Sequence, residues 1–336
     1  MFTRSHTSLV FLLALPALAA PASAFACASC GSTLSSDWES QGFSTHSGLR
    51  MDIRYDYLDQ NQLRSGTGTI SPQAASQVVT PSGDLQEVEK YTNNRYLTLG
   101  LDYSFNPDWG VNVQLPYIDR SHATLGTNSD GSNPADGAYD SHTRNIGDVK
   151  VVGRYQGFLP RHNLGLLLGL KLATGGHTQT GISTDPASVG AMTAIDRGLQ
   201  PGTGTTDAIV GLYYFDAINR DWEYFAQGTY QTALNSSDNY KPGDAYSLHA
   251  GLRYMGFDSV VPQLQLNTRY ARHDSGSNAD TVSTGGTLVY LSPGVVVPLN
   301  KRVSLYGFVQ LPVYQDVNGV QLTPRSIVSV GTRLAF

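Results

Sequence analysis

The final twelve residues, Arg325 to Phe336, alternate between two kinds of side chain, and this alternation limits the fold more than any other feature. Counting back from Phe336, one face is mainly apolar and the other is small or polar: Leu334, Thr332, Val330 and Val328 against Ala335, Arg333, Gly331 and Ser329. A strand with one face for lipid and one for water, ending on a phenylalanine, is typical of the last strand of a bacterial outer-membrane β-barrel. The outer face of such a barrel only meets lipid, so function has to be sought in the interior and the loops.

The same alternation recurs along the chain in segments of about ten residues. It predicts twelve strands, at 47–58, 93–104, 109–119, 146–157, 164–174, 205–216, 221–232, 245–256, 262–272, 286–298, 302–313 and 325–336. Connections after the even-numbered strands are short, whereas those after the odd-numbered strands are longer and polar. Outer-membrane barrels have short periplasmic turns and long external loops, and an even strand count returns both ends to one side.

We therefore predict an all-β fold, a 12-stranded antiparallel transmembrane β-barrel of the bacterial outer membrane with both termini periplasmic. A soluble β-sandwich is the alternative, because regularly spaced strands also suit that fold. A sandwich does not explain the alternating connection lengths. It also leaves unexplained the leucine stripe of 164–172, which is too apolar for a solvated face.

The N-terminal region divides into two predicted segments. Residues 1–24 carry Arg4, an apolar run from Ser8 to Ala20 and a small-x-small site at Ala22–Ala24, which together predict a secretory signal peptide. Residues 25–46 form a periplasmic N-terminal segment with a CxxC pair, able to act as a plug or docking element, and the barrel fills 47–336. The net charge of −5 gives no basic footprint for nucleic acid.

Three stretches resemble a known family. They are Gly147-Asp-Val-Lys-Val-Val-Gly-Arg-Tyr155, Gly169-Leu-Lys-Leu-Ala-Thr-Gly175 and Pro201-Gly-Thr-Gly-Thr-Thr-Asp-Ala-Ile-Val-Gly-Leu-Tyr-Tyr214. They are similar to strand signatures of the outer-membrane channels associated with the meta-pathway of phenol degradation. The resemblance runs from about residue 90 to the end of the chain. It implies a channel-like transmembrane β-barrel, and the family name implies uptake of aromatic compounds.

The strand phase predicts which charged residues line the interior, because charges at bilayer depth are tolerated when they face water or one another. The predicted lumen and pore-lining residues are Arg50, Asp52, Arg54, Asp56, Asp102, Asp148, Lys150, Arg154, Lys171, Glu223, His249, Arg253, Arg269 and Arg333. Bases outnumber acids in this set, so a mildly basic lumen would favour small anions. Salt bridges that close a narrow barrel are the alternative. Six aromatic residues also face inward on this register, as a stacking slide or as space-filling groups: Tyr96, Tyr213, Phe225, Tyr290, Tyr306 and Phe308.

Both cysteines lie in the N-terminal segment, at Cys27 and Cys30. In an oxidising periplasm this spacing favours a small disulfide, with a redox-sensitive latch or a docking element as alternatives. Gly31 stands where a haem-attachment motif needs histidine, and a zinc site would need two further ligands. A similar pair occurs in much larger barrels that sheathe cytochromes, which implies the partner-docking alternative.

These observations predict an outer-membrane channel for passive uptake of small solutes, with anionic and aromatic compounds as candidates. The expected partners are outer-membrane lipid, lipopolysaccharide, a small-molecule solute and, in the docking alternative, a periplasmic protein such as a redox protein. Neither a cofactor nor a metal is expected, although Asp130, Asp136 and Asp140 leave a calcium loop as an alternative. Five histidines could serve an outer-membrane enzyme, but no local arrangement supports one: His122, His142, His177, His249 and His273.

Overall fold

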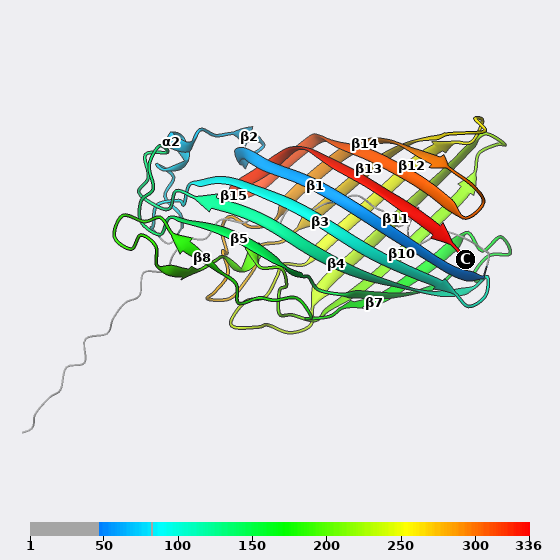
Figure 1. Cartoon of the computed structure of the whole chain (residues 1–336), viewed down its shortest axis with the longest axis horizontal. Coiled ribbons are helices and arrows are strands. Elements are labelled where there is room, and N and C mark those ends of the chain that lie inside the picture. Colours follow the sequence, from blue (N-terminus) through cyan, green and yellow to red (C-terminus); the bar gives the residue numbers. More distant parts are fainter. Residues whose placement is uncertain (1–46, 82) are drawn as a thin grey trace, which may run out of the picture.

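The computed structural model describes residues 47–81 and 83–336, and within these residues eleven antiparallel strands close into a barrel (Figure 1). In order around the wall they are β1 (Gly48–Gly66), β3 (Glu89–Ser104), β4 (Trp109–Thr124), β6 (Lys150–Tyr155), β7 (Leu164–Lys171), β10 (Asp207–Ala217), β11 (Trp222–Ala233), β12 (Ala245–Tyr254), β13 (Val261–Ala271), β14 (Gly286–Pro298) and β15 (Val303–Ala335). Pairing of β15 with β1 closes the sheet. The predicted all-β antiparallel barrel is confirmed. The predicted signal peptide 1–24 and segment 25–46 lie outside the described residues.

β15 is one element where the sequence predicted two strands, 302–313 and 325–336. Its first half pairs with β14 from Ser304 to Val317, and its second half pairs with β1 from Val320 to Ala335. The chain reverses between these halves at Gly319, whose φ of 58° suits glycine. The predicted long connection here is therefore wrong, because the strands stay paired up to a tight turn.

The remaining elements gather at the end of the barrel where the long connections lie (Figure 1). They are β2 (Gly68–Thr69), α2 (Pro72–Ala75), β5 (Tyr139–Ile146), β8 (Thr180–Ser183), β9 (Met192–Ala194) and the 3-10 helix η1 (Arg197–Leu199). β6 pairs with β4 from Trp109 to Gln114, near the short turns. β5 extends the wall by pairing with β4 from Tyr117 to Thr124, near the long connections. The strand predicted at 146–157 corresponds to β6, which begins later, at Lys150, and β5 lies in the segment predicted as a long connection. Asp148 lies between β5 and β6.

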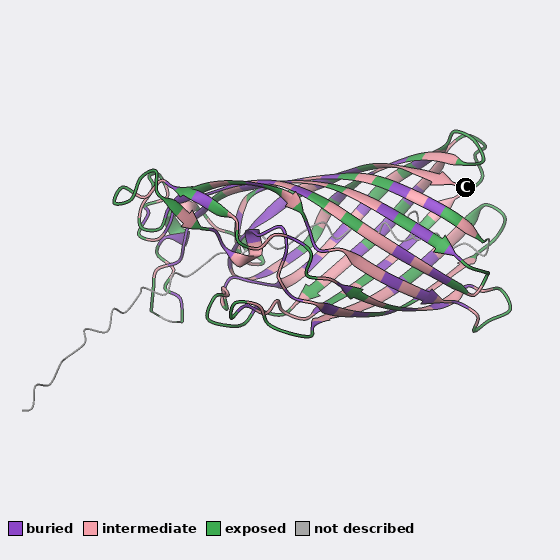
Figure 2. Cartoon of the chain, turned by 60° about the horizontal axis from the view of Figure 1, so that its bottom comes forward, coloured by how far each residue is buried: buried purple, intermediate pink, exposed green. Residues whose placement is uncertain are grey.

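Side chains alternate along the barrel strands between an exposed outer face and a buried inner face (Figure 2). On β4 the outer face is apolar from Trp109, 54% exposed, to Tyr117, 44% exposed. The next outward residue is Asp119, which binds Arg144 at 2.9 Å. An apolar band of this length matches a membrane-spanning strand of about 9–11 residues. The wall beyond Tyr117, including β5, projects past the band.

Aromatic side chains on the inner face lie against glycines of the neighbouring strand. Tyr213 covers Gly165, Phe225 covers Gly251 and Phe308 covers Gly294. A Cβ atom at any of these glycines would lie 2.1–2.3 Å from the ring. Because the rings occupy space that a side chain would fill, they pack along the wall and stabilise the register.

Helices play a minor part in the described residues. No helix among them is long and apolar enough to cross a membrane.

Candidate channel interior

The interior near the short-turn end is organised around Asp102 on β3. Its two carboxylate oxygens each accept a hydrogen bond at 2.5 Å, one from Arg50 on β1 and one from Arg154 on β6. Both guanidinium groups also donate to the hydroxyl of Ser104, at 2.6 Å from Arg50. The Asp102 side chain is completely buried. Two cations therefore share one carboxylate and tie three strands together.

A second group lies between β1 and β15. The hydroxyl of Tyr306 donates to both oxygens of Asp52 at 2.9 Å. Asp56 accepts from Arg54 at 2.8 Å and from the hydroxyl of Ser329 at 2.6 Å. Asp52 and Asp56, the two aspartates predicted to face inward on β1, are thus bound by donors on the same inner face.

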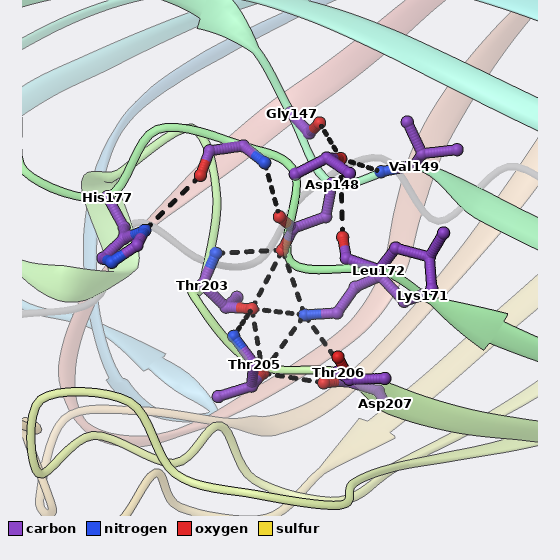
Figure 3. Close-up of polar contacts among 12 residues, drawn as sticks. Gly147, Asp148, Val149, Lys171, Leu172, His177, Thr203, Thr205, Thr206 and Asp207 are labelled. Carbon is purple, nitrogen blue, oxygen red and sulfur yellow. Dashed lines mark hydrogen bonds and ion pairs between the residues drawn. The ribbon is translucent and has the colours of Figure 1, made fainter.

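A third group lies at the long-loop end and centres on Asp148 (Figure 3). Lys171 places its Nζ atom 3.1 Å from Asp148 and 3.0 Å from Asp207. Asp148 also accepts from the backbone nitrogen atoms of Gly175 at 3.0 Å and Thr203 at 2.9 Å. These bonds hold the break between β5 and β6 against the segments that follow β7 and precede β10. Asp148 therefore connects the break in the wall to β7 and to the segment that precedes β10.

The other predicted residues are also buried or half-buried. Glu223 on β11 forms an ion pair with Arg253 on β12. The Nδ1 atom of His249 lies 3.0 Å from the side-chain oxygen of Asn267. Arg333 lies opposite Asp52 in the strand register. The last two members, Lys150 and Arg269, line a cavity of about 280 Å³ inside the barrel at the long-loop end.

The sequence analysis missed several buried charged residues, and two of them, Asp207 and Arg120, lie on the inner face of barrel strands. Asp207 is 2% exposed and pairs with Lys171, and Arg120 is 5% exposed. Arg120 donates to Asn94 and Tyr96 on the wall and to the carbonyl oxygen of Gly198 in η1, at 3.0 Å. The alternation already carried the signal, because Asp207 shares the inward phase of Tyr213. Arg120 was missed because the predicted strand ended at residue 119, whereas β4 continues to Thr124.

The six aromatic residues predicted to face inward are mostly buried. Tyr213, Phe225, Tyr290, Tyr306 and Phe308 are at most 5% exposed. Tyr96, the sixth, packs against the apolar cluster that contains Tyr290. Their packing supports the space-filling alternative over a stacking slide.

The long connections contain a separate cluster of buried acidic side chains. Asp196, which precedes η1, is 6% exposed, and one of its carboxylate oxygens has no hydrogen-bond partner. Burial, together with Glu87, Glu89 and Asp280, raises the pKa of Asp196 well above its usual range. Burial likewise raises the pKa of Asp280 to about 6, although its carboxylate accepts two backbone hydrogen bonds of 2.7 Å.

The aspartates and histidines considered for a metal site or an enzyme contact neighbouring groups. Within residues 47–81 and 83–336 no group of three or more histidine, cysteine, aspartate or glutamate side chains could hold a metal ion. Asp130 and Asp136 bond to Ser132 and Asn128 in the exposed loop. Three of the candidate histidines have contacts with other groups: His122 binds Thr92, His142 binds Asp119 and His177 lies near Asp238. Cys27 and Cys30 lie outside the described residues.

Known proteins resemble the chain in structure. No family model and no curated protein sequence matches it. The COG4313 outer membrane channel from Pseudomonas putida F1 is similar over 89% of this chain and 98% of its own, with a TM-score of 0.61 and 11% identity. The β domain of the Bordetella autotransporter BrkA covers 87% of this chain and 100% of its own, with a TM-score of 0.48 and 16% identity. The monoaromatic hydrocarbon channel CymD covers 87% and 89%, with a TM-score of 0.46 and 9% identity. The Pseudomonas putida structure shows that this chain has the fold of an outer-membrane β-barrel.

Proposed function

We propose that the chain is an outer-membrane channel for the passive passage of small solutes through a mildly basic interior. One observation carries this proposal: the closed barrel is apolar outside and lined inside with buried charged and amide groups. Outer-membrane barrels with a water-filled lumen have a polar inner face of this kind. The likeness to a solved outer membrane channel supports the same function.

The membrane topology follows from the strand order. Counting the two halves of β15 separately gives twelve crossings, with the short connections and Phe336 at the same end. That end would face the periplasm, and the long connections would face outward. Trp109 and Trp222, both exposed at the short-turn end, would form part of the periplasmic aromatic girdle.

Small anions are the solutes that the interior favours. When Arg120, Asp207 and Glu89 are added to the predicted set, inward-facing bases on the barrel strands still outnumber acids. The other buried acids, Glu87, Asp196 and Asp274, lie in the loops. Positive side chains in a pore lower the barrier for anions. The aromatic-compound alternative rests on the family resemblance, since the inward aromatic rings are packed against the wall.

Swelling of proteoliposomes in isotonic solute tests the channel function. We expect sodium benzoate and arabinose to enter vesicles that contain the protein faster than protein-free vesicles. Ala271→Trp, which fills an interior cavity, should slow entry, whereas Tyr270→Trp on the exposed outer face of the same strand should not. Equal swelling with and without the protein would contradict the channel.

The docking alternative remains a prediction about residues 25–46. Deletion of that segment should abolish co-purification of a periplasmic protein if docking is correct. It should leave the swelling rate unchanged if the segment is not a plug.

A further inference from the structure

On one side of the barrel, the outer face changes from apolar to charged at the same place in the strand register. The last apolar outward residues of three neighbouring strands are partners there: Leu97 on β3, Tyr117 on β4 and Ile146 on β5. The next outward residues toward the long connections are again partners: Arg95, Asp119 and Arg144. Two arginines and one aspartate therefore lie directly beyond the apolar band.

The two arginines and a histidine converge on the single carboxylate of Asp119. Arg144 donates from Nε to one carboxylate oxygen at 2.9 Å, and Nη1 of Arg95 lies 3.5 Å from the other oxygen. Nε2 of His142, two residues farther out on β5, lies 2.9 Å from that second oxygen. Two permanent positive charges thus share one negative charge.

The guanidinium groups remain accessible from outside the barrel. The Arg144 side chain is 59% exposed and the Arg95 side chain 43%, whereas that of Asp119 is 21% exposed. Within residues 47–81 and 83–336, Asp119 is the one acid that forms an ion pair with either arginine, and it engages Arg144 through Nε. The terminal nitrogen atoms of Arg144 can therefore bind an external oxyanion, in the fork geometry that matches phosphate.

Two further acids lie on this outer face, at a greater distance from the band or from the arginines. Asp59 on β1 accepts a hydrogen bond of 2.8 Å from Asn61 and is the register partner of Asn93. Asp140 lies four residues beyond Arg144 on β5, about 13 Å along the strand. In the described part of the chain, neither acid forms an ion pair with Arg95 or Arg144.

The outer face across the barrel ends differently. Tyr230 on β11, Tyr246 on β12 and Tyr270 on β13 lie side by side, with ring centroids 4.8 and 6.0 Å apart. Neutral tyrosine rings suit the boundary between acyl chains and headgroups. Beyond them, Arg272 pairs with Asp244 at 3.7 Å, one base with one acid. The excess positive charge therefore distinguishes the β3–β5 side from this side.

We infer that Arg95 and Arg144 form a binding site for a phosphate group of a lipid in the outer leaflet, which in a bacterial outer membrane is the phosphorylated glycolipid lipopolysaccharide. The inference rests on the membrane topology proposed above with the channel function, because the long connections then face outward. Lipopolysaccharide carries its phosphates on sugars directly above the acyl chains. The chains would lie against Leu97, Tyr117 and Ile146, and the phosphate would reach the arginines. Arginine forms bidentate, charge-assisted hydrogen bonds with phosphate, and basic side chains beside a membrane attract anionic headgroups.

Native mass spectrometry of the detergent-solubilised full chain with bisphosphorylated lipid A, the membrane anchor of lipopolysaccharide, tests the site. Lipid A should bind the wild type, and Arg95→Gln combined with Arg144→Gln should weaken binding about tenfold or more. Arg95→Lys combined with Arg144→Lys keeps the charges without the fork, so it should weaken binding less. The matched control is Arg161→Gln, which removes a 78% exposed arginine paired with Asp216 near the short turns and should match the wild type.

Equal lipid A binding by the double glutamine variant and by Arg161→Gln would overturn the inference, as would equal binding of lipid A stripped of both phosphates. Inorganic phosphate that binds the wild type as tightly as lipid A would indicate an ion site and would also overturn it. If the double variant does not fold, Arg144→Gln and Arg144→Lys decide the question by the same comparison.

Failure of this site and failure of the channel are distinguishable. A wild type that binds lipid A through the arginines but leaves a planar bilayer sealed would contradict the channel and keep the site. A conducting wild type that binds lipid A equally with and without its phosphates would do the reverse.

Discussion

At the residue scale, Asp102 shows what burial adds to a prediction made from strand phase. The alternation placed it inward but could not name its partners, because β6 is distant in sequence. The structure gives it two arginines at 2.5 Å, from β1 and from β6. The interior charges nearest the short turns are thus salt bridges, which is the alternative that the sequence left open.

Replacing Asp102 tests this arrangement. Asp102→Asn would leave two buried guanidinium groups facing one neutral amide, so the free energy of unfolding should fall by about 3 kcal/mol. Urea unfolding of the protein in lipid vesicles, followed by tryptophan fluorescence, measures the change. Asp216→Asn, which breaks an ion pair with a guanidinium that is 78% exposed, should cost less than about 1 kcal/mol. Equal losses in both variants would contradict the account.

The buried aspartates of the long loops predict a pH dependence. The pKa of Asp280 is raised from a usual value near 4 to about 6, so the folded loops hold this proton more tightly than the unfolded chain does. The raised pKa of Asp196 acts in the same direction. Their stabilising contribution is complete below pH 4 or so and is lost as the pH rises through about 6. Hydrogen exchange of residues 272–285, corrected for intrinsic rates, should therefore be slower at pH 5 than at pH 7.5.

Asp280→Asn separates this cause from a general effect of pH. The amide oxygen can still accept the two backbone hydrogen bonds, but the group no longer titrates, so the difference between the two pH values should shrink. Asp258→Asn in an exposed short connection should leave the difference as it is in the wild type. An unchanged difference in Asp280→Asn would rule out this residue as a cause.

At the element scale, the strands were predicted well where both faces obey the alternation and less well beyond the membrane. β14 has the predicted bounds, and β10 to β13 differ by no more than two residues at each end. β1 and β4 run further than predicted, to Gly66 and Thr124, since their outer faces turn polar there while the backbone pairing continues. The division between β5 and β6 could not be predicted, because it depends on the contacts of Asp148 with distant loops.

The glycine positions beneath aromatic rings give a test of the wall itself. Gly251→Ala would place a Cβ atom 2.3 Å from the ring of Phe225, so the ring must move. We expect a loss of about 1–3 kcal/mol in the free energy of unfolding, measured by the same urea titration. Gly228→Ala on β11, whose nearest neighbour would be 4.0 Å away, is the matched control and should cost less. A larger loss at Gly228 would contradict the packing described.

At the scale of the whole molecule, alternation and connection lengths were enough to predict a closed antiparallel barrel. They could not predict the cavity, because its lining combines side chains from strands β6 to β14 with loops that cover them. Strand phase predicted a mildly basic interior, and the structure shows ion pairs at both ends of it: Arg50 and Arg154 with Asp102, and Lys171 with Asp148 and Asp207. The central claim is that this interior conducts small solutes.

Single-channel recording in planar lipid bilayers tests that claim most directly. In a gradient of potassium chloride, the full-length protein should produce discrete current steps, and the reversal potential should indicate a preference for chloride over potassium. Lys150→Gln with Arg269→Gln should reduce this preference, while Arg220→Gln, in an exposed short connection, should not. A bilayer that stays sealed after insertion of folded protein would contradict the account.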